Sequence, residues 1–294
     1  MVYKMKPAGK TEVDLRWGGS GSRGMVFTKL HGNGNDFILI DELLRELVPE
    51  NLKSTFAIRN CHRNFGIGGD GVLFLTKSVE YDLGMRLFQP DGSEAEMCGN
   101  GVRCLAKYAW DMGYVGQGFT VETKAGPIPI HVRMIDDIFW ARLEMGVPRF
   151  DRSEIPASGR GEFLKERMNQ FEVSAVNTGV PHAVIFVDDL NIPINDLAPP
   201  VRNNPVFPEG ANVDFVRAGE DIEIRVFERG IEAETLSCGT GAVASATVAR
   251  RFGLAGDEVH IKTRGGPLIV TFEGDLAFLE GPAVTVYWGS LDER

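Results

Sequence analysis

Two cysteines of this chain each begin the pattern Cys-Gly-Xaa-Gly, once at residues 98–101 and again at residues 238–241. After both Cys98 and Cys238, apolar residues recur at spacings of three and four, which predicts a helix that starts at the glycines. The free N–H groups and the positive dipole end of a helix start bind carboxylates or phosphates and favour a thiolate over a thiol. The sequence therefore predicts two thiols of lowered pKa, each beside an anion-binding turn.

The two motifs belong to a longer internal repeat. Three segments of the first half recur in order in the second half, namely residues 85–89, 98–101 and 123–128 as residues 224–228, 238–241 and 263–268. Thr123 follows Cys98 at the same separation as Thr263 follows Cys238. The period is too long for a solenoid and predicts two domains of similar structure. Since an isolated cysteine before a glycine turn is more often a buried structural residue, it is the duplication that favours a catalytic pair.

The elements that would position these thiols give an α/β fold. Runs of β-type residues at 26–30, 37–40, 72–75 and 84–88 predict strands before the first helix. We expect a disordered leader or tail over residues 1–24, an N-terminal domain over residues 25–145 and a C-terminal domain over residues 146–282.

Composition limits the classes of function. The 294 residues are 43% hydrophobic and 24% charged, typical of a soluble globular protein. A formal charge of −10 disfavours nucleic acid as a partner, and the chain lacks the roughly 18 consecutive apolar residues of a membrane span. Four cysteines are too few for a disulfide scaffold, and no secretory signal precedes them. We therefore expect a cytoplasmic protein.

Two other uses of these motifs are disfavoured. Structural zinc sites pair their ligands closely, whereas five residues separate Cys98 from Cys104 and Cys238 has no neighbouring cysteine or histidine. Residues 66–71 match the spacing of a dinucleotide-binding loop, but the run that follows is β-type and not helical. We therefore expect neither a metal nor a nucleotide cofactor.

Several polar residues have an ordinary structural explanation when each is considered alone, and they indicate a functional site only in combination. His182 starts a predicted strand, where a histidine is more often structural than catalytic, and the pair Glu228-Arg229 ends another strand. Asn35 and Asn212 lie in predicted turns, where asparagine is common for conformational reasons alone.

Together these residues match a known pattern, and the chain from about residue 25 onward resembles the diaminopimelate epimerases, which are amino-acid racemases independent of pyridoxal phosphate. The matching segments, in order, are residues 31–37, 91–94, 98–101, 179–182, 211–214, 228–230 and 238–241. The resemblance implies two pseudo-symmetric domains, each a curled sheet around a central helix, with the site between them. It also implies an isomerase of lysine and peptidoglycan-precursor biosynthesis, a homodimer, no cofactor, and a last strand within residues 283–294 that returns to the first domain.

The resemblance assigns roles residue by residue. Cys98 would deprotonate the L,L substrate at Cα and Cys238 would protonate the opposite face. The backbone N–H groups of Gly99, Asn100, Gly239 and Thr240 would hold the α-carboxylate. His182 and Glu228 would bind the α-amino group or tune the thiols, while Asn35, Asn212 and Arg229 would bind the distal end of the substrate.

The chain departs from the family pattern at two positions of the distal pocket. Gln89 stands where the family commonly has asparagine, and Val180 replaces the asparagine of a Gly-Asn-Pro-His segment. The proton-transfer chemistry does not depend on either side chain, but the identity of the substrate does. Two alternatives therefore remain: a racemase of the same fold acting on another amino acid, or a non-catalytic protein that binds amino acids or senses redox state.

Overall fold

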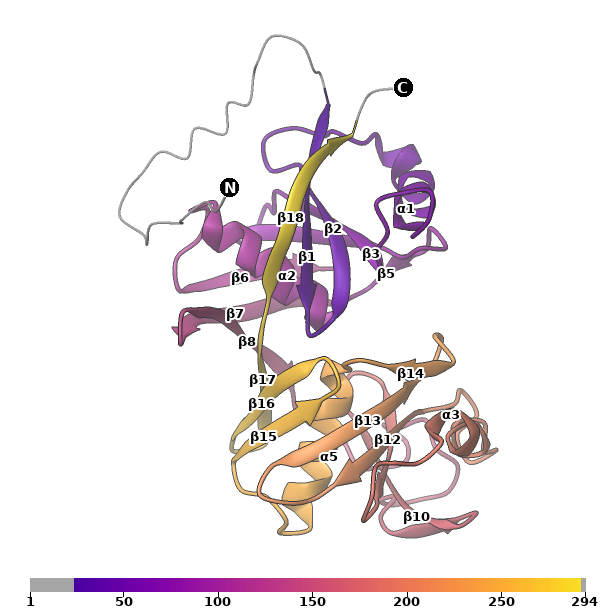
Figure 1. Ribbon diagram of the computed structural model, residues 1–294. Coiled ribbons are helices and arrows are strands. Elements are labelled where there is room, and N and C mark those ends of the chain that lie inside the picture. The colour runs from indigo at the N-terminus through magenta and orange to yellow at the C-terminus, as the bar shows by residue number, and fades with distance from the viewer. Residues whose placement is uncertain (1–23, 292–294) are drawn as a thin grey trace.

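The computed structural model describes residues 24–291 as two stacked halves joined by strands (Figure 1). The first half contains β1 (Met25–Gly32), β2 (Asn35–Asp41), a 3-10 turn (Glu50–Leu52), α1 (Lys53–Cys61), β3 (Gly71–Thr76), β4 (Leu83–Phe88), β5 (Glu94–Ala95), α2 (Gly99–Asp111), β6 (Gly118–Thr123), β7 (Gly126–Ile135) and β8 (Ile138–Gly146).

The second half repeats this order with short additional helices. It contains β9 (Glu166–Met168), β10 (Phe171–Asn177), β11 (Pro181–Phe186), α3 (Ile194–Leu197), α4 (Pro199–Arg202), β12 (Asn212–Arg217), β13 (Ile222–Glu228), β14 (Ala233–Thr235), α5 (Gly239–Arg251), β15 (Glu258–Thr263), β16 (Gly266–Glu273) and β17 (Leu276–Pro282). The last strand, β18 (Val284–Leu291), leaves this half and pairs antiparallel with β1.

The strand pairing confirms the internal repeat. In the first half β2 runs parallel to β3, β3 antiparallel to β4, and β4 parallel to β6. Strands β11, β12, β13 and β15 have the same order and the same directions. The mixed α/β fold class predicted from the sequence is therefore correct.

Each sheet curls around one helix. The apolar residues of α2 predicted from their spacing, among them Val102, Leu105 and Ala109, are buried in the core of the first half. The alanine-rich and valine-rich face of α5 fills the equivalent core of the second half. Because each helix starts at a glycine turn at one end of its sheet, the core packing fixes where the two N-termini point.

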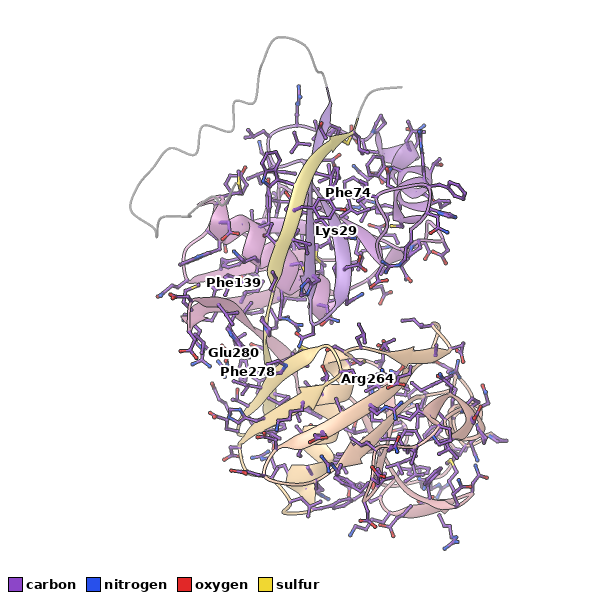
Figure 2. All side chains as sticks on the ribbon, in the orientation of Figure 1. Lys29, Phe74, Phe139, Arg264, Phe278 and Glu280 are labelled. Atoms are coloured by element: carbon purple, nitrogen blue, oxygen red, sulfur yellow. The ribbon has the colours of Figure 1, made fainter. Side chains whose placement is uncertain are left out.

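Two strands and several charged groups join the halves. β17 pairs antiparallel with β8, and Arg133 on β7 forms an ion pair with Glu280 on β17, with 2.5 Å between Nε and Oε1. Arg142 stacks over the ring of Phe278, 3.6 Å from its centroid. Figure 2 shows Phe278 and Glu280 at this junction, beside the start of β18.

Three helices, α1, α3 and α4, were absent from the sequence expectations, and α1 shows the reason. Half of the buried residues of α1 are polar, namely Lys53 and Asn60, so the helix has no continuous apolar stripe. The domain limits at residues 145 and 282 stay predictions, and the leader of residues 1–24 lies outside the described residues except for Gly24. No helix within residues 24–291 is long and apolar enough to cross a membrane.

A glycine contact between the halves gives a first prediction. A Cβ atom on Gly265 would lie 1.9 Å from the backbone oxygen of Asn33, so the turn of β15 and β16 has no room for one. We expect Gly265→Ala to lower the free energy of unfolding by about 1–3 kcal/mol, as over-packing does. Thermal unfolding followed by circular dichroism measures the loss. Gly256→Ala, with no atom within 4 Å of the added Cβ, is the control; equal melting temperatures of the two variants would contradict the prediction.

Candidate active site

The two cysteines of the repeat are the N-cap residues of α2 and α5, and both have extended backbones. The first helical residues, Gly99 and Gly239, face a common side chain. A Cβ atom placed on them would lie 4.0 Å and 2.8 Å from Cδ2 of Leu279 on β17. The fold therefore brings the two helix N-termini, each with free N–H donors, to one place at the junction of the halves.

Asn100, the second residue of α2, connects the two thiol regions. Its Nδ2 donates to Oδ1 of Asn35 over 3.2 Å and to the backbone oxygen of Ser237, the neighbour of Cys238, over 3.3 Å. Asn35 Oδ1 also accepts from the sulfur of Cys98 at 3.7 Å. The side chain of Asn100 is thus oriented by contacts from both halves, and that of Asn35 by contacts within the first half.

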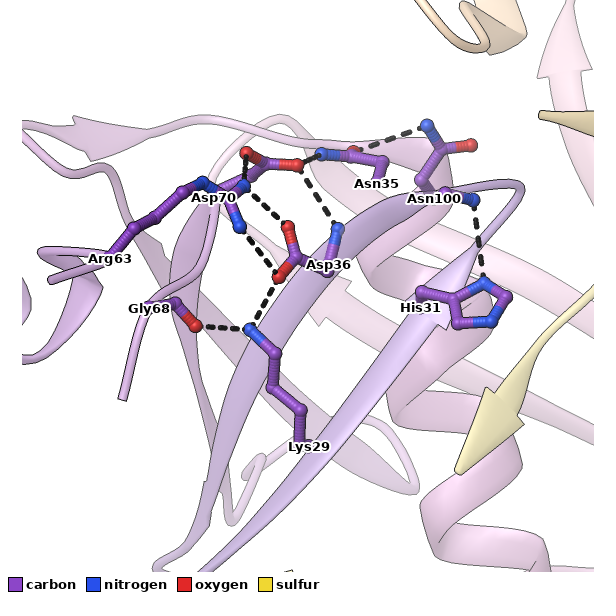
Figure 3. A network of polar contacts seen from close by, with 9 residues as sticks. Lys29, His31, Asn35, Asp36, Arg63, Gly68, Asp70 and Asn100 are labelled. Atoms are coloured by element: carbon purple, nitrogen blue, oxygen red, sulfur yellow. Dashed lines mark hydrogen bonds and ion pairs between the residues drawn. The ribbon is translucent and has the colours of Figure 1, made fainter. Parts of the chain in front are cut away.

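A charged network behind Asn35 holds its amide (Figure 3). Asp70 Oδ2 accepts from Asn35 Nδ2 over 2.7 Å, so Oδ1 of Asn35 turns toward the thiol. Asp70 is in turn paired with Arg63, which also pairs with Asp36, and Lys29 pairs with Asp36 from the opposite side. Burial alone would raise the pKa of Asp36, but the bonds from Arg63 and Lys29 outweigh it and lower the pKa to about 2. Neither Asp70 nor Arg63 was identified from the sequence, although Asp70 lies in the glycine-rich loop of residues 66–71.

In the second half, hydrogen bonds lead from a buried carboxylate to a thiol. His182 Nδ1 lies 2.7 Å from Asp214 Oδ2, and its Nε2 lies 3.0 Å from Thr240 Oγ1. Asn212 Nδ2 donates to the same Nε2 over 3.2 Å, which places the ring proton on Nδ1. Thr240 Oγ1 is 3.4 Å from Cys238 Sγ. The chain Asp214–His182–Thr240–Cys238 is fully assembled, and Asp214 is the member to which the sequence had assigned no role.

Glu228 lies against the same thiol. Its carboxylate accepts a short bond from Thr235 and contacts Cys238. Burial raises the pKa of Glu228, although its hydrogen bonds and His182 oppose the change. The negative charge of Glu228 in turn raises the pKa of both Cys98 and Cys238.

The predicted direction of the thiol pKa values is wrong. Burial raises the pKa of Cys98 and raises that of Cys238 well above its ordinary value. Backbone N–H groups of Asn100 and Gly101 lower the pKa of Cys98, and Gly241 lowers that of Cys238, as expected at helix starts. Removal from water is the larger effect, because a thiolate loses more hydration than these donors replace.

The two thiol environments differ at equivalent positions. The strand registers place Phe37 and Leu73 in the first half where the second half has His182 and Asp214. The surroundings of the glycines at the helix starts show the same replacement of apolar side chains by polar ones. A Cβ on Gly101 would meet Leu73 and Phe37, whereas a Cβ on Gly241 would meet Asp214 Oδ1 at 2.7 Å. A polar chain therefore reaches Cys238, while apolar side chains fill the corresponding space beside Cys98.

Arg229, Gln89 and Val180, which were expected near the distal end of the substrate, are less closely connected to the thiols. The backbone N–H of Arg229 donates to Asn212 Oδ1 over 2.7 Å, and Arg229 Nη1 donates to the backbone oxygen of Glu209 over 3.2 Å. Gln89 is exposed in the turn after β4, and Val180 is half-buried before β11. Hydrogen bonds within residues 24–291 do not connect either of these two side chains to the thiols. A small pocket lined in part by Met97, Thr178 and Gly179 lies next to Val180.

The other two thiols, those of Cys61 and Cys104, do not belong to the site around Cys98 and Cys238. Cys61 and Cys104 are buried, and burial raises the pKa of Cys61 to about 11. Across the described part of the chain, no three histidine, cysteine or acidic side chains are grouped as metal ligands.

Comparison with known proteins identifies the family. The family model described as diaminopimelate epimerase matches residues 27–150 and 174–286. The chain belongs to the diaminopimelate epimerase family. A diaminopimelate epimerase of Methanothrix thermoacetophila is 66% identical over 92% of this chain and 97% of its own. One from Archaeoglobus fulgidus is 46% identical over 91% and 96%.

Solved structures of other families share the fold. A phenazine biosynthesis protein of the PhzF family from Bacillus anthracis has a TM-score of 0.68 at 19% identity, covering 92% of this chain and 99% of its own. A hydroxyproline epimerase from Agrobacterium vitis has a TM-score of 0.62 at 16% identity, covering 92% and 91%. The predictions of the diaminopimelate epimerase family, its fold and an isomerase activity are confirmed.

The charge of Glu228 gives a second prediction. Glu228→Gln removes a negative charge that raises the pKa of both thiols, so each thiol should ionise at lower pH. Alkylation by iodoacetamide near pH 8, located by peptide mass spectrometry, should accelerate at Cys98 and Cys238 by up to about tenfold, the effect of about one pKa unit.

The matched control is Glu232→Gln in the adjoining turn, where the carboxylate is exposed and bound to Arg202. This control should leave both alkylation rates unchanged. Slower or unchanged alkylation in Glu228→Gln would contradict the prediction.

Proposed function

We propose that this protein interconverts L,L- and meso-diaminopimelate by proton transfer at Cα between two thiols, without a cofactor. The observation that carries the proposal is the convergence of two cysteine N-caps on one buried junction. Inversion at a carbon requires removal of a proton from one face and delivery to the other, which two groups on opposite sides perform without crossing the substrate. The family supports diaminopimelate as the substrate.

Protons are conserved in one turnover, but the two cysteines end with exchanged protonation states, which proton exchange with solvent must reset before the next turnover in the same direction. The Cys98 thiolate takes the α-proton of the L,L substrate and becomes a thiol, leaving the electron pair on Cα. The Cys238 thiol then gives its proton to the opposite face and becomes a thiolate. In the reverse direction, the two cysteines exchange roles. The raised pKa of Cys238 suits this cycle, since the group that protonates must first hold its proton.

Charge that develops on the substrate is met by the helix starts. The N–H groups of Gly99, Asn100, Gly239 and Thr240 are the donors available for the α-carboxylate, onto which the carbanion delocalises. Such preorganised donors act strongly because the surroundings exclude water. His182 contacts Thr240 and Glu228 contacts Cys238, which supports a role for them in binding the α-amino group or in adjusting the protonation of the thiols.

The far end of the substrate is assigned to the two asparagines and the arginine. Asn35 and Asn212 present amide groups held by Asp70 and by the Arg229 backbone. The guanidinium fork of Arg229 suits a carboxylate. Gln89 and Val180 would border this end, where they determine how closely a distal amino-carboxylate is held.

Hydrogen exchange in deuterated water tests the reaction. NMR should show deuterium entering Cα of L,L-diaminopimelate as the meso form appears, with the thiols kept reduced. We expect Cys98→Ala and Cys238→Ala each to reduce meso formation by at least about 100-fold, the scale of acid–base catalysis.

A panel of proline, histidine and lysine serves as the substrate control. Exchange on one of these amino acids alone would retain the two-thiol chemistry and assign another substrate. Binding without exchange of any α-hydrogen would contradict the proposal and favour an amino-acid-binding protein.

We also propose that the protein works as a homodimer in the cytoplasm. All four cysteines are free, as expected in a reducing compartment. Apolar side chains are exposed along the paired strands β1 and β18, namely Val26, Val284, Val286, Tyr287 and Trp288. A strip of this kind is suited to a second copy of the same chain, since monomers rarely expose contiguous apolar surface.

Sedimentation analysis tests the dimer. Val286 is 54% exposed, so Val286→Asp should disturb a dimer contact without disturbing the core of either half. We expect this variant to sediment as a monomer while the unmodified chain sediments as a dimer. Val79→Asp, at a fully exposed turn of the first half, should keep the unmodified mass. A dimer retained by Val286→Asp, or a monomeric parent chain, would contradict the assignment.

A further inference from the structure

Arg103 is a buried cation one turn beyond Cys98. Its side chain is 0% exposed within α2 and lies at the junction of the halves. Nη2 donates to Asn33 Oδ1 over 2.9 Å and to Asn100 Oδ1 over 2.8 Å, and Nε donates to the backbone oxygen of Pro282 over 3.4 Å. Nη1 is buried without a hydrogen-bond partner among the described residues.

Other buried cations of the chain are each paired with a carboxylate. Lys29 pairs with Asp36 and Lys53 with Glu42, both at 2.6 Å, and Arg152 pairs with Glu166. Within residues 24–291, Arg103 has no ion pair, and its hydrogen-bond acceptors are neutral oxygens. A buried charge without a counter-charge is costly, so its retention requires a compensating role.

The packing around Arg103 prevents its guanidinium from reaching water. A Cβ atom placed on Gly32 or on Gly281 would lie 3.1 Å from atoms of the guanidinium. These glycines come from β1 and β17, one from each half, and leave a slot that the group fills. The positive charge is therefore fixed in position relative to the start of α2.

The contacts of Arg103 lead directly to the thiol site. Because Asn100 Oδ1 accepts from Arg103, Asn100 Nδ2 must face Asn35 and the backbone of Ser237. The charge of Arg103 also favours the ionised form of Cys98 and lowers the pKa of that thiol. Burial lowers the pKa of Arg103 itself to about 10, and the charges that oppose this change come from Cys98 and Cys104.

We propose that Arg103 is a positioning residue whose unpaired charge is balanced by the anion that forms at the start of α2, either the Cys98 thiolate or the α-carboxylate of the substrate. The carboxylate half of this inference rests on the proposed function. The thiolate half does not, and it is open to measurement without substrate.

Alkylation of Cys98 in the full chain, without substrate, tests the charge. Iodoacetamide rates are followed against pH by peptide mass spectrometry, with circular dichroism confirming the fold. In Arg103→Met, alkylation of Cys98 near pH 8 should slow by about tenfold or more, as for a rise of about one pKa unit. Arg103→Lys keeps the charge but not the fork, so Cys98 should react within about threefold of the parent rate while kcat falls.

Asn33→Asp offers a test that leaves Arg103 in place. The new carboxylate would stand at the 2.9 Å contact with Nη2 and supply the missing counter-charge. Alkylation of Cys98 should again slow by about tenfold near pH 8, and KM for the substrate should rise. Arg152→Met, which removes a buried arginine that already has a carboxylate partner, is the control and should leave Cys98 unchanged.

A parent-like rate for Cys98 in folded Asn33→Asp or Arg103→Met would overturn the inference. If Arg103→Met does not fold, Arg103→Lys and Asn33→Asp decide between the outcomes. Slowed alkylation in a protein that exchanges no α-hydrogen would sustain the role of Arg103 and reject the proposed function.

Discussion

Two helices that point their N-termini at one buried volume repel each other electrostatically, and much of the structure serves to maintain that arrangement. The positive dipole ends of α2 and α5 meet at Leu279, and each carries N–H groups without intrahelical acceptors. Each helix is held from behind by its own curled sheet. The paired strands β8 and β17 then join the two halves into one continuous sheet. The approach leaves N–H donors and positive dipole ends without partners in the helices, an arrangement that favours negatively charged ligands.

The internal repeat places the two cysteines symmetrically, but the side chains around them differ between the halves. Both halves place a cysteine at the same point of the same motif. The space beside Cys98 contains Phe37 and Leu73, whereas that beside Cys238 contains His182 and Asp214. The different neighbours give each thiol its own proton equilibrium.

The sequence predicted the elements whose signals are local. Residues at helical spacing after each cysteine identified α2 and α5, and matched segments identified the repeat. It could not predict α1, where Lys53 is buried against Glu42 by contacts that no periodicity reveals. The direction of the thiol pKa values also depended on tertiary burial. The burial of Arg103 has no local signal in the sequence, because Pro282 and Gly281, which enclose it, lie far along the chain. Asp70, which holds Asn35, was missed for the same reason: its loop was considered only as a nucleotide motif, and Asn35 lies elsewhere in the sequence.

The return of β18 to the first half has a mechanical consequence. The chain passes between the halves twice, once after β8 and once between β17 and β18, and these two passages lie side by side because β8 and β17 are paired (Figure 1). The two adjacent crossings form a single line of attachment between the halves. A relative motion of the two halves would have this line as its axis. An opening that admits a ligand would therefore be a rotation about that line.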